Sequence, residues 1–402
     1  MKILGPLCGL FALARAQFEN LDNLQDVLDA DVEQFHHVGI SASLFTKLDY
    51  LMKAQSGKRM KGDDAAIHFD DQWVMGSNTK SMVATVAAKV VDMGLIQWNT
   101  TVKELFHDAG LFEVNEGYWP STLELFLSHG SGAPGLEPIS SIYVDLVDYI
   151  FNKTSWVDGY DNRAERIYLS ATILKDDPYV PQYTFEYSIG GFTIAGAMLE
   201  VATNKTFEEL CQELLFDPLE MEGCGFGPTT TDPTLPPNQP WGHLSDVWAY
   251  RNLPVPPSDF SNIASSMVPD GGIKCNLDSW RKYLLAHLFE DTDFLPAEQW
   301  TKLHTPIVGG YYGFGWFIDN SNPLVGTVFT HGGTDGHNFA NCVIIPRFQI
   351  GANIATNVAN QGVQGIGFNK VLEWMFTNLG KKESEHIASI AEKSRLLEYR
   401  HL

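Results

Sequence analysis

The chain has 402 residues, of which 44% are hydrophobic and 19% are charged, and this balance excludes intrinsic disorder and collagen-like repeats. It carries 49 acidic and 27 basic side chains, a formal net charge of −22 at pH 7. A chain this acidic repels phosphate, so the composition argues against a nucleic-acid partner and against binding to an anionic membrane.

The first sixteen residues predict a secretory signal peptide. Lys2 precedes an apolar stretch over residues 3–14, and Ala14-Arg15-Ala16 has the small residues typical of a cleavage site. The stretch is shorter than the roughly 18 apolar residues that a membrane-spanning helix needs. We therefore expect a secreted protein that begins at Gln17 and has no membrane anchor. The alternative is an ordinary buried N-terminal helix.

Strands are expected toward both ends of the chain, with helices between them. Strand-type patterns occupy residues 38–45 and 66–75, and apolar residues at helical spacing predict a helix over 77–94. Further helices are expected over 121–128, 189–215, 278–289 and 370–379, and further strands over 311–318, 326–331 and 338–356. This order indicates an α+β fold with an antiparallel sheet built from both chain ends and flanked by helices.

The same order predicts one domain over residues 17–380, with a mainly helical part inserted at about 95–300. Residues 228–257 hold eight of the 20 prolines, so this segment is expected to be a long ordered loop. Residues 381–402 are rich in charge and are expected to form a helical tail.

Four cysteines follow the predicted signal peptide: Cys211, Cys224, Cys275 and Cys342. In a secreted protein they could form disulfides, and four cysteines allow three pairings. The pair Cys211–Cys224 closes the shortest loop and is the favoured one. Unpaired buried cysteines are the alternative, because a core of this size is stable without disulfides.

Three Asn-x-Thr sequons are candidate glycosylation sites. They lie at Asn99, Asn152 and Asn204. In a secreted eukaryotic protein each would be expected on the surface with an N-linked glycan.

The candidate for chemistry is Ser77-Asn78-Thr79-Lys80, an S-x-x-K sequence that opens a mostly apolar helix. The i, i+3 spacing places Ser77 and Lys80 on one helical face, beside the free N–H groups of the helix N-terminus. Burial would favour the neutral amine of Lys80, which could then accept a proton. A second S-x-x-K, from Ser279 to Lys282, lies in a surface-type helix and is expected to be structural. A helix-capping serine beside a solvated lysine is the alternative for the first copy.

Further short motifs follow in order along the chain. They are 122–132 (TLELFLSHGSG), 185–191 (FEYSIGG), 216–221 (FDPLEM), 271–273 (GGI), 312–316 (YGFGW) and 331–333 (HGG). With the S-x-x-K sequence, this ordered set resembles the serine β-lactamase and penicillin-binding-protein superfamily, above all class C β-lactamases and their esterase and transesterase relatives. The resemblance spans about residues 35–376.

The resemblance implies a role for each matching position. Ser77 would be the nucleophile that forms an acyl-enzyme, Lys80 would accept or relay its proton, and Tyr187 would be a second base. A nearby ammonium would favour the phenolate of Tyr187, for which an ordinary core tyrosine is the alternative. The backbone N–H groups of Ser77 and Thr334, with Gly333 adjacent, would form the oxyanion hole. This chemistry needs no metal and no organic cofactor.

Two positions depart from the family pattern. Ile189 stands where relatives that act on β-lactams have an asparagine that binds the acylamino group. His331 replaces the lysine of the family's Lys-Thr-Gly, so its positive charge is expected only below its pKa, which is near 6.5 when unperturbed. We therefore expect the rate to show an ionisation of His331 between about pH 6 and 8.

These departures favour a secreted serine hydrolase that acts on small uncharged esters or amides. Its partner would be a small-molecule acyl substrate. The alternatives are a D-aminoacyl peptidase or amidase, an acyltransferase, a weak β-lactamase, and a non-catalytic scaffold with a retired site.

Overall fold

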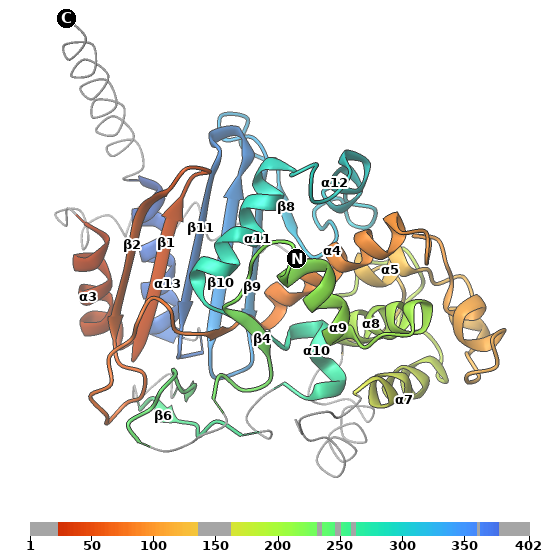
Figure 1. The fold of residues 1–402 in the computed structure, drawn as a ribbon, viewed down its shortest axis with the longest axis horizontal. Coiled ribbons are helices and arrows are strands. Elements are labelled where there is room, and N and C mark those ends of the chain that lie inside the picture. The colour runs from red at the N-terminus through yellow and green to blue at the C-terminus, as the bar shows by residue number, and fades with distance from the viewer. Residues whose placement is uncertain are drawn as a thin grey trace, which may run out of the picture.

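The computed structural model describes residues 23–135, 162–230, 235–245, 251–258, 263–359 and 362–377. Within these residues, six strands form an antiparallel sheet in the order β2-β1-β11-β10-β9-β8. They are β1 (Gly39–Phe45), β2 (Tyr50–Gly57), β8 (Phe317–Asp319), β9 (Val328–Thr334), β10 (Phe339–Ile345) and β11 (Ile350–Thr356). An early and a late strand of the chain meet inside this sheet, where Ile40 of β1 pairs with Thr356 of β11 (Figure 1).

Helices cover both faces of the sheet. Helices α3 (Leu24–Phe35) and α13 (Gly362–Thr377) pack together on one face, and α11 (Leu277–Phe289) packs on the other, against β11 and β1 (Figure 1). Every residue of β1 and β11 is buried as a result, which explains their apolar and small side chains.

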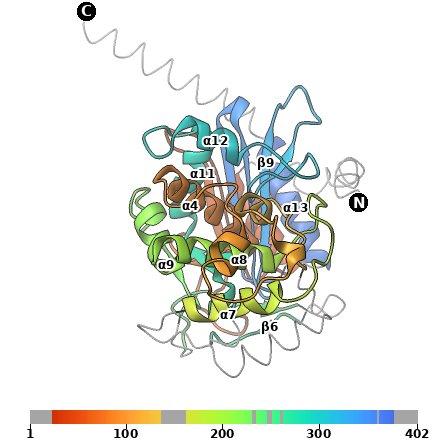
Figure 2. The same cartoon turned by 90° about the vertical axis from the view of Figure 1, so that its right-hand side faces the viewer.

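A second, mainly helical part lies beside the sheet (Figures 1 and 2). At its centre, α4 (Thr79–Asp92) packs against α8 (Ile189–Thr203), α10 (Val268–Gly271) and α12 (Ala297–Leu303). Both long helices are apolar on nearly all sides, because eleven residues of each are buried. The remaining α-helices described are α5 (Leu123–Leu127), α7 (Arg163–Leu174) and α9 (Phe207–Cys211).

Shorter elements join the two parts. A small sheet has the order β3-β7-β4, and β5 pairs with β6. These strands are β3 (Trp73–Val74), β4 (Cys224–Phe226), β5 (His243–Leu244), β6 (Leu253–Pro254) and β7 (Ile273–Cys275). Single helical turns are η1 (Gly76–Asn78), η2 (Lys103–His107), η3 (Glu116–Tyr118), η4 (Gln212–Phe216), η6 (Ser265–Met267) and η7 (Pro346–Phe348).

The α+β fold is confirmed, and several expected elements lie within a few residues of their predicted bounds. The strand expected over 311–318 shortens to β8, the segment 338–356 forms two strands, β10 and β11, and the helix expected over 370–379 begins at Gly362 in α13. Three more differ. The helix expected over 189–215 ends at Thr203, because Asn204 adopts a left-handed conformation and the capping box of Thr206 starts α9. The strand expected over 66–75 shortens to β3. The proline-rich segment 228–257 contains the short strands β5 and β6 as well as loop.

Several expectations fall on other parts of the chain. The signal peptide over 1–16, the tail over 381–402 and the sequon at Asn152 lie outside the described residues. The other two sequons, Asn99 and Asn204, have exposed side chains, as a glycan requires. Among the described residues, no helix has the length and apolar character needed to cross a membrane.

The predicted Cys211–Cys224 disulfide is wrong. Cys224 is bonded to Cys275, because β4 and β7 pair in a register that sets these two residues directly opposite each other. Cys211 points into the core from α9 and is unpaired, as is the buried Cys342, within the described part of the chain. The loop-length argument failed because strand pairing, not sequence distance, brings the partners together.

Replacing Cys275 by serine should lower the stability of the protein by about 4 kcal/mol, since the disulfide closes a loop with a sequence separation of 51 residues. Urea unfolding of the oxidised protein and of the variant measures this loss. A Cys211→Ser variant is the control: it keeps the Cys224–Cys275 disulfide, so a reductant should lower its urea midpoint as it does that of the parent, whereas the Cys275→Ser variant should unfold at the same urea concentration with and without a reductant. A Cys275→Ser variant as stable as the parent would contradict the prediction.

Candidate active site

The turn that carries Ser77 is pressed against the end of β9. A Cβ atom at Gly333 would lie 2.4 Å from the backbone nitrogen of Ser77, and one at Gly76 would lie 2.3 Å from that of Thr334. Gly76 also has φ +51°, which favours glycine. Only glycine fits at both positions. The backbone nitrogens of Ser77 and Thr334 therefore belong to adjoining segments, and the Ser77 side chain is partly exposed beside them.

Lys80 lies one helical turn after Ser77 and is fully buried. Its ammonium donates to Ser77 Oγ at 3.0 Å, to the backbone carbonyl of Asp270 at 3.1 Å, and to Asp270 Oδ1. Burial by itself would lower the pKa of Lys80, but the Asp270 carboxylate and Tyr187 outweigh it and raise that pKa. The expected neutral amine is therefore wrong.

Asp270 is a site residue that the sequence reasoning missed. Its side chain is only 8% exposed and forms an ion pair with Lys80. It stands on α10, immediately before the Gly271-Gly272 pair that belongs to the motif series. An acidic residue directly preceding a motif was the available signal, but nothing in the sequence indicated that it reaches Lys80.

Tyr187 and His129 lie side by side around the lysine. The Tyr187 ring centroid is 4.9 Å from Lys80 Nζ and 4.3 Å from the His129 ring centroid. His129 Nδ1 accepts from the backbone N–H of Ser188 at 2.9 Å, and Ser188 caps α8. This bond holds the segment that presents Tyr187. Burial first, and then the charge of Lys80, lowers the pKa of His129 well below its ordinary value, so the ring is neutral.

His331 is buried on β9 and is neutral, so the expected ionisation between about pH 6 and 8 is wrong. Its Nδ1 lies 2.7 Å from the Gly332 carbonyl and carries the proton, so Nε2 accepts from the Tyr312 hydroxyl at 3.2 Å. Burial, with a contribution from Lys80, lowers the pKa of His331 to about 3. The rate should therefore show no His331 ionisation between about pH 6 and 8.

Acid should destabilise this protein through its buried histidines. The folded pKa values of His331 and His243 are about 3 and about 4, below the unperturbed value near 6.5. The unfolded chain therefore binds protons first, and stability falls as the pH drops from about 6.5 toward 3, by up to about 1.4 kcal/mol per pH unit for each histidine. Urea midpoints measured from pH 7 to pH 4 test this. A His331→Gln variant should show a shallower decline, and an equal decline would contradict the role of His331.

The second S-x-x-K does not form a comparable arrangement. Ser279 is buried near the start of α11, and its hydroxyl accepts from the backbone N–H of Gly223 at 2.9 Å. Lys282 donates to the Glu220 carbonyl and to Glu222. The structural interpretation of this copy agrees with these contacts.

The other predicted positions fit around the same centre. Ile189 is the first residue of α8, directly after the Tyr187-Ser188 pair, and is partly buried against the main core. The ring of Phe185 contacts that of Tyr311 at a tilt, with the centroids 5.0 Å apart, and Tyr311 is 43% exposed. Within the described residues, no group of three or more His, Cys, Asp or Glu residues is arranged to hold a metal ion.

Comparison with known proteins gives a consistent set of relatives. A family model described as "Beta-lactamase" matches residues 24–366. The curated "Penicillin-binding protein 4" of Amycolatopsis lactamdurans is 22% identical over 347 residues, which cover 83% of this chain and 84% of that protein. The "Unguisins hydrolase ungD'" of Aspergillus campestris is 24% identical over 201 residues, 49% of this chain and 35% of that protein.

Solved structures show the same fold at low sequence identity. The octameric penicillin-binding protein homologue from Pyrococcus abyssi has a TM-score of 0.69 and 20% identity, covering 88% of this chain and 76% of that one. The D-amino acid amidase from Ochrobactrum anthropi has a TM-score of 0.64 and 17% identity, covering 88% and 98%. These two similarities concern the fold alone.

Proposed function

Because the chain belongs to the beta-lactamase family, whose members are serine hydrolases, we propose that Ser77 attacks the acyl group of a small uncharged ester or amide. An acyl-enzyme forms on Ser77, and water or an acceptor alcohol releases the acyl group. The observation that carries the proposal is the 3.0 Å contact between Ser77 Oγ and Lys80 Nζ at a partly exposed serine.

The protonation of Lys80 supports Tyr187 as the base. Lys80 already donates to Ser77 Oγ, so the hydroxyl proton of Ser77 has to go to another group. Tyr187 lies beside this pair, with its ring centroid 4.9 Å from Lys80 Nζ. In the proposed step, Tyr187 enters as the phenolate. The Ser77 Oγ–carbon bond forms as the serine proton passes to the phenolate oxygen, and the same proton then goes to the leaving group as its bond to the acyl carbon breaks. The N–H groups of Ser77 and Thr334 would stabilise the oxyanion.

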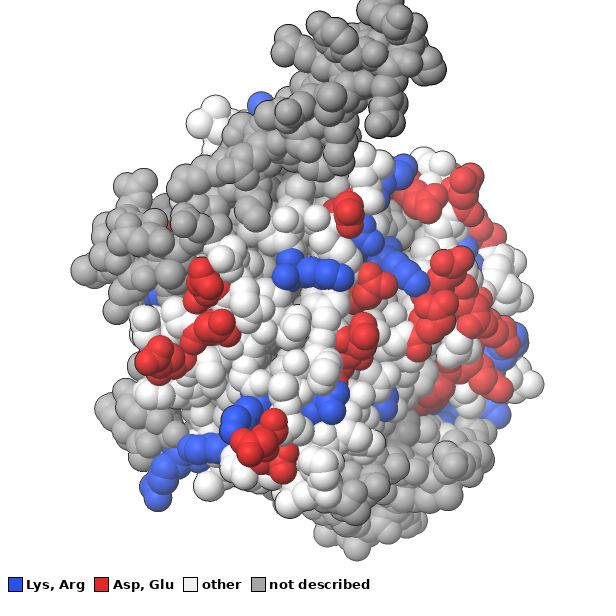
Figure 3. Space-filling model, turned by 60° about the vertical axis from the view of Figure 1, so that its left-hand side comes forward, with Lys and Arg blue, Asp and Glu red and all other residues white. Residues whose placement is uncertain are grey.

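The choice of an uncharged substrate rests on the charges around Ser77. His331 is neutral where the family pattern has a lysine, and the Lys80 charge is matched by Asp270. Ile189 offers no amide to a β-lactam side chain. The chain carries a formal net charge of −22, and acidic side chains gather over part of the face in Figure 3, so the overall field of the protein does not attract an anionic substrate. A D-aminoacyl amide remains the second candidate, because the fold is shared with a D-amino acid amidase.

Secretion is part of the proposal. A disulfide such as Cys224–Cys275 persists in oxidising compartments, in agreement with the predicted signal peptide. N-terminal sequencing of the protein recovered from the medium should give Gln17 as the first residue. An uncut N-terminus, or retention inside the cell, would contradict this part of the proposal.

Short p-nitrophenyl esters should be turned over with a larger kcat/KM than nitrocefin. The reason is that Ile189 has no amide for the acylamino group of a β-lactam, and neutral His331 has no charge for its carboxylate. A panel of p-nitrophenyl esters, D-aminoacyl amides and nitrocefin measures this directly. Faster turnover of nitrocefin would contradict the proposed substrate class. Faster turnover of D-aminoacyl amides would make the second candidate the function.

A further inference from the structure

We propose that Asp270 is a positioning residue that keeps Lys80 protonated and thereby sets the pH at which the Lys80–Tyr187 pair gives up its first proton. This inference rests on the proposed function, because it concerns the same nucleophile.

The hydrogen bonds of Lys80 carry the inference. An ammonium has three N–H donors, and Lys80 has three acceptors: Ser77 Oγ, the Asp270 carbonyl and Asp270 Oδ1. Two of the three belong to Asp270. A buried lysine without a carboxylate partner tends to lose its proton, so Asp270 is the group that stabilises the charged form.

The charge balance has a consequence for the base. Lys80 and Asp270 together carry no net charge, so a phenolate on Tyr187 has a neutral ion pair beside it rather than a lone cation. Without the Asp270 charge, a lone ammonium would stand beside the tyrosine. The pair would then lose its first proton more readily, whether that proton leaves Lys80 or Tyr187.

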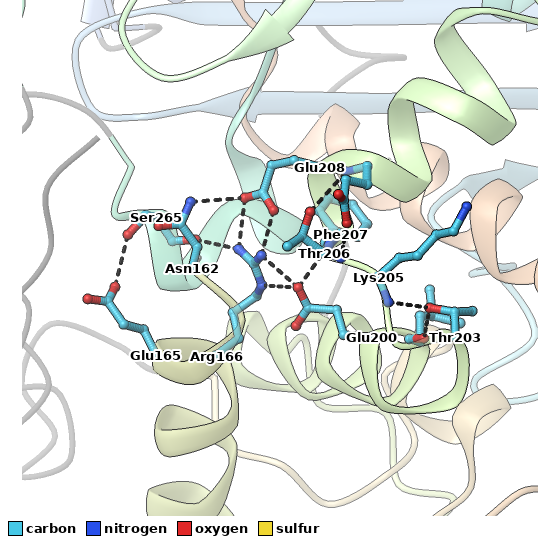
Figure 4. Close-up of polar contacts among 12 residues, drawn as sticks. Asn162, Glu165, Arg166, Glu200, Thr203, Lys205, Thr206, Phe207, Glu208 and Ser265 are labelled. Atoms are coloured by element: carbon cyan, nitrogen blue, oxygen red, sulfur yellow. Dashed lines mark hydrogen bonds and ion pairs between the residues drawn. The ribbon is translucent and has the colours of Figure 1, made fainter. Parts of the chain in front are cut away.

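The other groups around the pair do not titrate in the same range. His129, which follows α5, and His331, on β9, have strongly lowered pKa values and stay neutral. Burial raises the pKa of Tyr312, in the loop before β8, well above its ordinary value. Behind α10, four charged residues on α7, α8 and α9 bond to one another or to Ser265: Glu165, Arg166, Glu200 and Glu208 (Figure 4). Asp270 is therefore the carboxylate that contacts Lys80.

An Asp270→Asn variant tests the proposal, since asparagine keeps the size and the acceptor oxygen but removes the charge. The acid limb of kcat/KM for a p-nitrophenyl ester should move to lower pH by about one to three units. Asp270→Glu should restore most of the original profile. Asp31→Asn is the matched control: Asp31 is buried on α3, which packs with α13 on the face opposite α11, and its loss should leave the limb in place.

Two titrations of the free protein separate this proposal from the proposed function. Tyrosinate absorbance, assigned with a Tyr187→Phe variant, follows Tyr187, and 13C NMR of lysine labelled at Cε follows Lys80. One of the two should titrate at lower pH in Asp270→Asn. If neither moves, or if the rate falls equally at all pH values, Asp270 is only structural and the proposal is overturned. If a fluorophosphonate leaves Ser77 unlabelled, the proposed function fails, and these titrations still decide the role of Asp270.

Discussion

Replacing Ser77 by alanine should abolish acylation, with a loss in kcat on the order of a millionfold. The reason is chemical: in the proposed reaction Oγ forms the covalent bond to the acyl group, and alanine has no atom that can form this bond. The partly exposed Ser77 has Lys80 Nζ at 3.0 Å and the Thr334 segment directly beside it.

The matched control for this experiment is Ser279→Ala. That serine opens the second S-x-x-K, but it is buried and accepts from the Gly223 N–H. Its loss should leave labelling by a fluorophosphonate probe unchanged. Mass spectrometry of the labelled protein identifies the modified residue, and an adduct on any serine other than Ser77 would remove Ser77 from the mechanism.

Replacing Arg166 by methionine should cost about 3–5 kcal/mol of stability, the largest loss expected from a single charged side chain here. Arg166 is fully buried and binds Glu200, Glu208 and the Ser265 carbonyl (Figure 4). Without it, the buried Glu200 has no cation beside it and must be protonated or stay charged at high cost. Burial already raises the pKa of Glu200, against the opposing effect of Arg166.

The ion pair of Lys205 and Glu213 provides the comparison for Arg166. Both side chains are nearly half exposed, 44% and 49%, so Lys205→Ala should cost at most about 1 kcal/mol. Urea unfolding of both variants at one pH measures the difference. Equal losses would contradict the prediction. They would show that the free energy of desolvating the Arg166 network cancels the stabilisation from its ion pairs.

The sequence predicted what depends on local patterns and on motif order. The S-x-x-K sequence, the position of Tyr187 and the glycines that face Ser77 all lie together in the structure. The predicted strand over 38–45 became β1, because its apolar pattern is local. By contrast, β2 was missed because only Met52 and Ala54 of its eight residues are buried, and its second half carries Gln55, Ser56 and Gly57 in place of apolar side chains.

The errors share a different physical cause, contacts between distant parts of the chain. Asp270 stands 190 positions after Lys80. Because the sequence did not reveal this contact, burial alone predicted a neutral lysine. His331 was expected to ionise between about pH 6 and 8, because its sequence neighbours say nothing about its burial or about the Tyr312 hydroxyl. The disulfide prediction failed because the pairing of β4 with β7 decides which cysteines meet.

The central pairing of β1 with β11 bears on how the protein is made. Ile40 pairs with Thr356, so a growing chain on the ribosome holds β1 long before its partner strand exists. Such distant pairings fold slowly. The turn that carries Ser77 also rests on Gly333 and Thr334, which are synthesised more than 250 residues after it. The proposed oxyanion hole therefore forms only after residue 334 has been synthesised, so a truncated chain that ends before β9 carries Ser77 without the segment that lies against it.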